Sequence, residues 1–182
     1  MLGSSPGPRV SWDWSQDGRY IIERVIAKTD EIWVLPLFGD RKAFPYLQGD
    51  YNQNHGKLSP NGRWLVYESD ESTRGEVYVQ SFPTPGRKSQ VSMNGGSNPI
   101  WGRDGKELFF IAADGKMMTV DVTESEGRFS PGVPKALFDA GLLPGASYDV
   151  AKDGRFLLPK PVEQGGSAPL DVIVNWPATL KK

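Results

Sequence analysis

Short apolar runs, each placed directly after a tight turn, dominate the hydrophobic pattern of this chain. Trp64 to Tyr67 follows the pair Asn61-Gly62, and Leu108 to Ile111 follows Asp104-Gly105. Glycine accepts a positive φ angle without a Cβ clash, so these pairs predict turns, and the aromatic and branched residues after them favour strands. Because several runs are apolar at consecutive positions, both faces of the strands are expected to be covered. No segment of helical length repeats its apolar residues at a spacing of about 3.6.

The turn and its strand occur four times along the chain, with glycines at positions 18, 62, 105 and 154. A copy therefore begins every 43 to 49 residues, and such a period is typical of a repeat architecture. Four-stranded sheets that are covered on both faces and repeated at this period match the blades of a β-propeller. We therefore predict an all-β propeller with about three and a half to four blades here, in a ring of roughly six to eight. The residues expected to build the turns are Asp17, Gly18, Asn61, Gly62, Asp104, Gly105, Asp153 and Gly154.

The repeats are predicted to span residues 10–47, 55–92, 97–138 and 147–176. Residues 1–9 are rich in Gly and Pro and fit a linker or a truncated N-terminus, and residues 177–182 form a short tail. Because the last repeat leaves few residues for an outer strand, we expect a homodimer or a continuation of the propeller upstream, since unpaired edges favour association. The strands expected before the turns are 10–14, 57–58, 99–101 and 148–150. The third strand of each repeat is expected at 31–37, 76–82, 117–122 and 171–176. A fourth strand is expected at 41–47, 89–92 and 135–138.

The composition excludes several classes of function. The formal net charge is −1 and the Lys and Arg residues are scattered, so no nucleic-acid partner is expected. The chain has no cysteine, which removes disulfides and thiolate chemistry. It has no run of about 18 apolar residues and no signal-peptide pattern at its start, so no membrane insertion is expected and the compartment stays unknown.

The candidate catalytic and metal-binding residues do not form a familiar pattern. His55 is the single histidine and has no companions for a zinc site, and the motifs of a nucleophile elbow and of a phosphate loop are absent. Asp13 to Gly18 resembles the start of a calcium loop, but Arg24 stands where a bidentate Glu is needed. Glu124 and Glu126 are interpreted as solvated loop charges, and most of the six tryptophans as packing residues between blades. We therefore expect no catalytic residues, no metal and no cofactor.

Four turns of the Ser-Pro-Asp-Gly-Arg type, each followed by an apolar strand and an Ile-Tyr-Val-like strand, resemble the TolB-type, WD40-like (PD40) propeller repeats of bacteria. The resemblance covers residues 10–176. Segments of the C-terminal half, such as Asp114 to Met118 and Gly132 to Pro134, are similar to the end of propeller regions attached to bacterial serine/threonine protein kinases and to some transcriptional regulators. The resemblance implies a sensory or protein-binding propeller that continues upstream and carries no catalytic residues. It is also compatible with a periplasmic or other extracytoplasmic location.

The function expected from these observations is non-catalytic binding of a protein or a small ligand on the propeller face, within a larger sensor or signalling protein. The alternative is the gating propeller of a prolyl-oligopeptidase-like serine peptidase whose catalytic domain is not in this chain. A hydrolase or lyase with its site in the channel is a third reading, which the single histidine disfavours. Because strands are used for packing, a site is expected in the loops at the channel mouth. The residues predicted there are Asn54, His55, Asp70, Arg74, Asn98 and Tyr148.

Overall fold

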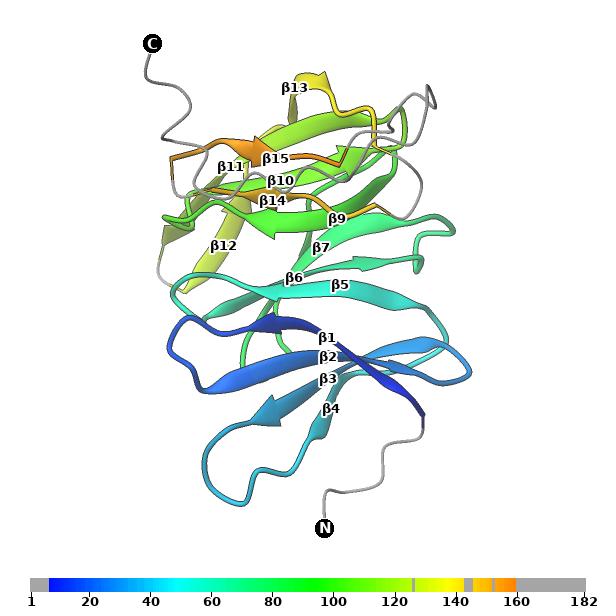
Figure 1. The fold of residues 1–182 in the computed structure, drawn as a ribbon, viewed down its shortest axis with the longest axis vertical. Helices are drawn as coiled ribbons and strands as arrows, with labels where there is room; N and C mark the ends of the chain where they lie inside the picture. Colours follow the sequence, from blue (N-terminus) through cyan, green and yellow to red (C-terminus); the bar gives the residue numbers. More distant parts are fainter. Residues whose placement is uncertain (1–6, 126, 143–145, 152, 160–182) are drawn as a thin grey trace, which may run out of the picture.

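The computed structural model describes residues 7–125, 127–142, 146–151 and 153–159, and every regular element in these ranges is a strand (Figure 1). Two four-stranded antiparallel sheets come first along the chain. In the first sheet the strands pair in the order β1 (Arg9–Trp14), β2 (Tyr20–Ile26), β3 (Asp30–Pro36) and β4 (Phe44–Leu47). In the second sheet the order is β5 (Gln53–Leu58), β6 (Trp64–Ser69), β7 (Glu76–Ser81) and β8 (Lys88–Gln90).

A third sheet has five strands, and one of them was not expected from the pattern. It contains β9 (Gly96–Trp101), β10 (Glu107–Ala112), β11 (Lys116–Ser125), β12 (Arg128–Pro131) and β13 (Lys135–Asp139). The first half of β11 pairs with β13, and its second half runs past the sheet and pairs with β12. A short hairpin of β14 (Asp149–Val150) and β15 (Phe156–Leu157) follows. The strand expected at 171–176 lies outside the described residues.

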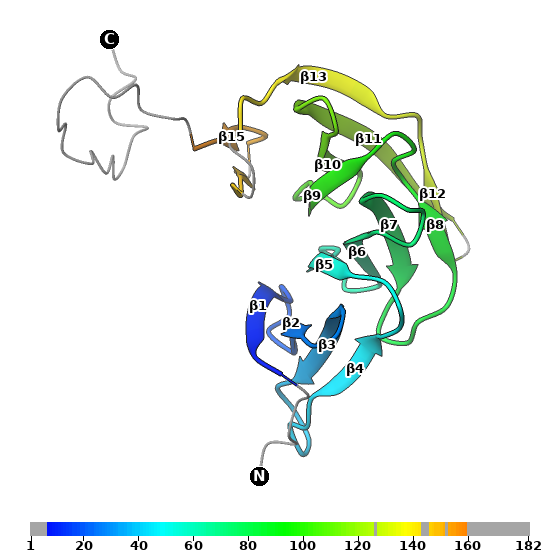
Figure 2. The same ribbon diagram turned by 90° about the vertical axis from the view of Figure 1, so that its right-hand side faces the viewer.

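The three sheets stand next to one another in an arc (Figure 2). The strands β1, β5 and β9 lie at the inner side of the arc, and β4, β8 and β13 lie at its outer side (Figure 2). The innermost strands are neighbours, since β1 contacts β5 and β5 contacts β9. Each sheet is therefore one blade, and the arrangement is that of part of a β-propeller.

Apolar side chains from facing sheets form the core between successive blades. Leu65 belongs to the interface of the first and second blades, where it packs with Ile22 and Ile32. Its neighbours along β6, Trp64 and Val66, belong instead to the interface of the second and third blades. This division confirms that consecutive apolar residues mark strands covered on both faces. The members of the second interface are Trp64, Val66, Val77, Val79, Val91, Trp101, Leu108, Phe110, Val120 and Phe129.

The four repeat turns share one geometry. Their glycines have φ angles of 72°, 67°, 72° and 80°, which is the left-handed region that favours glycine. The preceding side chain accepts a backbone hydrogen bond from two residues further on, at 3.0 Å from Arg19 to Asp17 and at 3.0 Å from Arg63 to Asn61. Asp104 and Asp153 accept the corresponding bonds at 2.9 and 3.4 Å. Each turn is thus fixed by its own Asp or Asn and glycine.

The placement of Asn54, His55 and Asn98 in loops was wrong. Strand β5 begins at Gln53 and β9 begins at Gly96, so all three residues lie within strands. The starts of these strands were missed because a bulge interrupts each strand, and because polar residues stand before the bulge, as at Gln53 and Asn54 in β5 and at Ser97 in β9. The expected packing role of the tryptophans also fails at Trp14, which is 65% exposed.

Candidate binding site

Bulges at the same place in three innermost strands create the candidate site. The pairing register shifts after Ser11 in β1, after Asn54 in β5 and after Ser97 in β9. A bulge adds one unpaired residue and re-aims the side chains beside it. His55 and Asn98 follow the shift points in β5 and β9 and have φ angles of 52° and 51°, which few residues other than glycine adopt.

These bulged segments enclose a small cavity, which we call the inner hollow. It has a volume of about 60 Å³ and takes its lining from the first, second and third blades and from the segment that leads into β14. The hollow therefore exists only when four segments far apart in sequence come together. Its lining residues are Trp12, His55, Lys57, Asn98, Pro99, Ile100, Ser147 and Tyr148.

A carboxylate behind the hollow holds His55 in place. The Nδ1 atom of His55 lies 3.1 Å from Oε2 of Glu68, and the backbone N–H of Asn98 donates to the same oxygen at 3.4 Å. The imidazole also packs on Trp12, with 4.6 Å between the ring centroids. Glu68 thus ties β5, β6 and β9 together at the back of the hollow. Sequence reasoning missed Glu68, because only the pairing of β5 with β6 brings it opposite Asn54.

Two hydrogen-bond donors at the hollow are left without partners. Tyr148 is 6% exposed, and its burial raises the pKa of the phenol, so the hydroxyl keeps its proton. Within the described part of the chain, neither the Tyr148 hydroxyl nor Nε1 of Trp12 has a hydrogen-bond partner. Asn98, in contrast, donates from Nδ2 to the carbonyl of Ala146 at 3.2 Å.

Three of the six predicted site residues, namely Asn54, Asp70 and Arg74, do not line the hollow. Asn54 is opposite Glu68 in the sheet but does not line the hollow. Asp70 accepts hydrogen bonds from the backbone and the side chain of Asn52, at 2.8 and 2.7 Å. His55, Asn98 and Tyr148 are therefore the predicted residues that the fold brings together.

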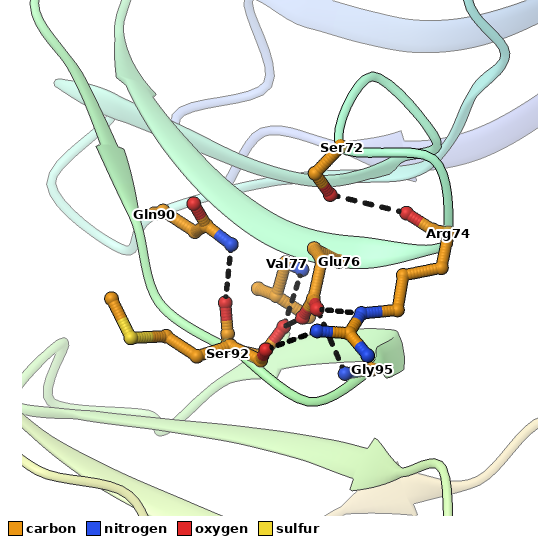
Figure 3. A network of polar contacts seen from close by, with 8 residues as sticks. Ser72, Arg74, Glu76, Val77, Gln90, Ser92 and Gly95 are labelled. Carbon is orange, nitrogen blue, oxygen red and sulfur yellow. Dashed lines mark hydrogen bonds and ion pairs between the residues drawn. The ribbon is translucent and has the colours of Figure 1, made fainter.

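Arg74 belongs to a separate polar network (Figure 3). Its Nε donates to Glu76 at 2.8 Å, and its guanidinium also donates to the carbonyl of Met93 at 2.6 Å. Glu76 is 1% exposed and further accepts hydrogen bonds from the backbone of Gly95, at 2.8 Å, and from the hydroxyl of Ser92. This network fixes the connection between the second and third blades, so Arg74 has a structural partner rather than a place at the hollow.

A second hollow lies beside the first, on the side of the repeat turns. Its volume is about 200 Å³, and Lys57 and Ile100 line both cavities. Asp13 lines the second hollow and accepts a hydrogen bond from the backbone of Leu58 at 2.8 Å. Burial raises the pKa of Asp13, while the bond from Leu58 and the charge of Lys57 oppose that shift. Sequence reasoning considered Asp13 only as the start of a calcium-like loop, and it missed Lys57, because nothing in the local pattern of Lys57 separates it from surface charges.

Two kinds of feature concern metal and membrane binding, clusters of metal ligands and membrane-spanning helices. Among the residues that the structure describes, no three His, Cys, Asp or Glu side chains gather as metal ligands. The same ranges contain no helix long and apolar enough to cross a membrane. Ser147 lines the hollow together with His55, but no hydrogen bond described in this structure joins the two side chains, as a nucleophile and its base require.

No protein-family model matches this sequence, and no curated protein matches it. Solved structures do match its fold. The TolB protein of Acinetobacter baumannii is similar with a TM-score of 0.58 and 15% sequence identity, over 84% of this chain and 36% of that chain. A Bacteroides uniformis protein assigned as a 6-phosphogluconolactonase is similar with a TM-score of 0.61 and 18% identity, over 88% and 52% of the two chains. A puromycin-hydrolyzing peptidase of Mycobacterium tuberculosis is similar with a TM-score of 0.60 and 18% identity, over 83% and 28% of the chains.

At these levels of identity the likeness shows the fold alone. Two of these three neighbours are named for enzymes, and the third is a TolB protein. The chain covers between 28% and 52% of the length of these three proteins. Antiparallel four-stranded blades in an arc, together with these neighbours, give the chain the fold of a partial TolB-like β-propeller.

Proposed function

We propose that this chain is a non-catalytic binding module that holds part of a protein or a small ligand in the inner hollow. The observation that carries the proposal is the pair of unpartnered donors, the Tyr148 hydroxyl and Trp12 Nε1, at a cavity built by four segments. A buried polar group without a partner costs about 1–3 kcal/mol. A bound group that accepts these hydrogen bonds would recover that free energy, so the hollow is suited to binding.

The wider setting is also a proposal. The resemblance of the C-terminal half to propeller regions of bacterial serine/threonine kinases supports a role as the binding part of a sensor or signalling protein. The resemblance to TolB-type repeats supports a location outside the cytoplasmic membrane. Fractionation of the native host, followed by detection of the full-length protein, would test the location. Recovery of the protein from the cytoplasm would contradict it.

A second candidate is the gating propeller of a serine peptidase. The likeness in fold to the puromycin-hydrolyzing peptidase of Mycobacterium tuberculosis favours this candidate. It requires a hydrolase domain with a Gly-x-Ser-x-Gly motif elsewhere in the full-length protein. Peptidase activity of the full-length protein, lost on substitution of that serine, would support gating rather than signalling.

The binding proposal is tested with a set of small polar fragments, using the indole N–H signals of the tryptophans in proton–nitrogen spectra. We expect fragments to shift the Trp12 signal, which the Trp12→Phe variant identifies by its loss. The double variant His55→Ala/Asn98→Ala should weaken binding at least about tenfold, because it removes two walls of the hollow. The control is Asp70→Ala, which alters a loop outside the hollow and should leave affinity unchanged.

The proposal fails if fragments bind only at other tryptophans, or if the double variant binds at the Trp12 signal as tightly as the unaltered chain. Circular dichroism of each variant confirms that the strands are retained. Turnover of a fragment by the unaltered chain, abolished by Ser147→Ala, would replace binding with catalysis as the function of the hollow.

A further inference from the structure

Three side chains that line the inner hollow carry hydrogen-bond donors, namely Trp12, Lys57 and Tyr148. Nε1 of Trp12 can only donate, and the ammonium group of Lys57 carries three N–H donors. The acceptor described for Lys57 is the carbonyl of Trp12, at the long distance of 3.4 Å. Together with Tyr148, whose hydroxyl has no partner among the described residues, Trp12 and Lys57 line a single cavity.

No carboxylate among the described residues lines the hollow to balance these donors. Glu68 lies behind His55, and its Oε2 is already used by the imidazole and by the N–H of Asn98. Asp13 faces the second hollow, where its Oδ2 accepts the N–H of Leu58. Asp13 lowers the net charge around Lys57 but supplies no acceptor within the inner hollow.

The volume limits what can enter. A water molecule occupies about 30 Å³ in the liquid, so a cavity of about 60 Å³ admits a group of a few heavy atoms rather than a whole ligand. The side chains of Pro99 and Ile100 add an apolar wall, which suits a short hydrocarbon stem.

We propose that the inner hollow binds a carboxylate group, carried by a small organic acid or by the C-terminus of a peptide. Two carboxylate oxygens accept about four hydrogen bonds, and those from a charged donor are the stronger ones. The carboxylate would accept from Trp12, Tyr148 and Lys57, and its stem would lie against Ile100. This inference rests on the proposed binding function and adds the chemical class of the ligand.

A bound cation is the opposite alternative, since the aromatic rings of Trp12 and Tyr148 can attract a positive charge. Lys57 lines the same cavity and would repel a bound ammonium group, while Glu68 is already held by His55. A neutral amide could accept from Trp12 and Tyr148 but would bring no negative charge to Lys57 within the inner hollow. A carboxylate therefore differs from both alternatives, the cation and the neutral amide, in the charge that it brings to the hollow.

The test compares sodium propionate with propionamide, a neutral probe of the same size, on the full 182-residue chain. The readout is the Trp12 indole N–H signal at constant ionic strength. We expect saturable binding of propionate in the millimolar range and at least about tenfold weaker binding of propionamide. Lys57→Met should weaken propionate binding at least about tenfold, and Lys57→Arg should retain most of it because the charge remains. Lys42→Met is the matched control, because Lys42 pairs with Asp40 on the surface and is 67% exposed.

The source of the carboxylate is decided by acetylated dialanine with a free or an amidated C-terminus. Tighter binding of the free acid than of propionate indicates a peptide C-terminus, and weaker binding indicates a small acid. Equal binding of propionate and propionamide, or unchanged propionate affinity in Lys57→Met, overturns the proposal that the hollow binds a carboxylate. Either result leaves the proposed binding function in place. If propionate does not shift the Trp12 signal while other fragments do, the carboxylate proposal is contradicted and the binding proposal is not. If no probe of any kind shifts that signal, both proposals fail.

Discussion

At the scale of single residues, Asp13 links the two hollows through its neighbour Lys57. Burial raises the pKa of Asp13, so the folded chain holds this proton more tightly than the unfolded chain, in which the pKa is near 3.8. Stability from this group therefore declines as the pH rises from about 3.8 through the raised pKa of the folded state. Asp17 behaves in the opposite way, because the hydroxyl of Ser15 lowers its pKa.

We predict that Asp13→Asn increases the free energy of unfolding, relative to the unaltered chain, more at pH 7 than at pH 3. An asparagine removes the buried charge and keeps an oxygen that can accept the N–H of Leu58. Urea denaturation at both pH values measures the difference. Asp17→Asn is the control and should show the reverse trend, since the stability from a lowered pKa is present at neutral pH and lost in acid. The same trend in both variants would contradict the burial effect at Asp13.

At the scale of elements, the hairpin of β11 and β12 joins the second blade to the third. Phe129 of β12 lies 5.5 Å from the ring of Trp64 in the second blade and 6.0 Å from Trp101 in the third. Glu124 of β11 accepts hydrogen bonds from Asn61 and Arg63 of the second repeat turn, at 3.1 and 3.0 Å. The hairpin therefore reaches across the blade boundary, and Glu124 is a bridging residue rather than the solvated charge that was expected.

Removing the Phe129 side chain should separate these blades. Phe129→Ala is expected to lower the free energy of unfolding by about 3–4 kcal/mol, because Phe129 is 8% exposed and its loss leaves a cavity beside two tryptophans. Phe44→Ala in β4 is the matched control, since Phe44 is 36% exposed and should cost about 1 kcal/mol or less. Denaturant titration compares the two variants. Similar losses in both would show that the hairpin does not stabilise the blade interface.

At the scale of the whole molecule, the first blade stands at one end of the arc (Figure 2). The first blade exposes apolar side chains, with Val10 and Ile26 each 40% exposed and Trp14 65% exposed. A blade face or strand edge without a neighbour favours association with another chain.

We therefore expect the 20.1 kDa chain to associate in solution, most simply as a dimer. Light scattering after size exclusion gives the mass, and circular dichroism of the same peak confirms the strands. Val10→Glu should lower the dimer fraction, while Val133→Glu should not, because Val133 lies in the third blade and is already 79% exposed. A folded monomer at all concentrations would contradict the expected association and would mean that the first blade is stable without a second chain against its exposed face.

Features that depend on residues close together in the chain could be predicted from the sequence. The Asp-Gly and Asn-Gly turns, the strands after them and the period of the repeats follow from backbone preferences that act over a few residues. Consecutive apolar residues such as Trp64, Leu65 and Val66 also indicated strands that are covered on both faces. This pattern supported the prediction of propeller blades. His55, Asn98 and Tyr148 could be predicted as site residues because they precede the turns in equivalent repeats.

Which of those residues come into contact could not be predicted from the sequence, because it depends on how the blades pack. Trp12, Lys57 and Glu68 have no local pattern that marks them, and they join His55 only because three bulged strands and β6 lie side by side. Asp70 and Arg74 have suitable chemistry, but the fold gives them other partners in Asn52 and Glu76. A ligand site depends on distances between segments that are far apart in sequence, and these distances are set by blade packing rather than by any local preference.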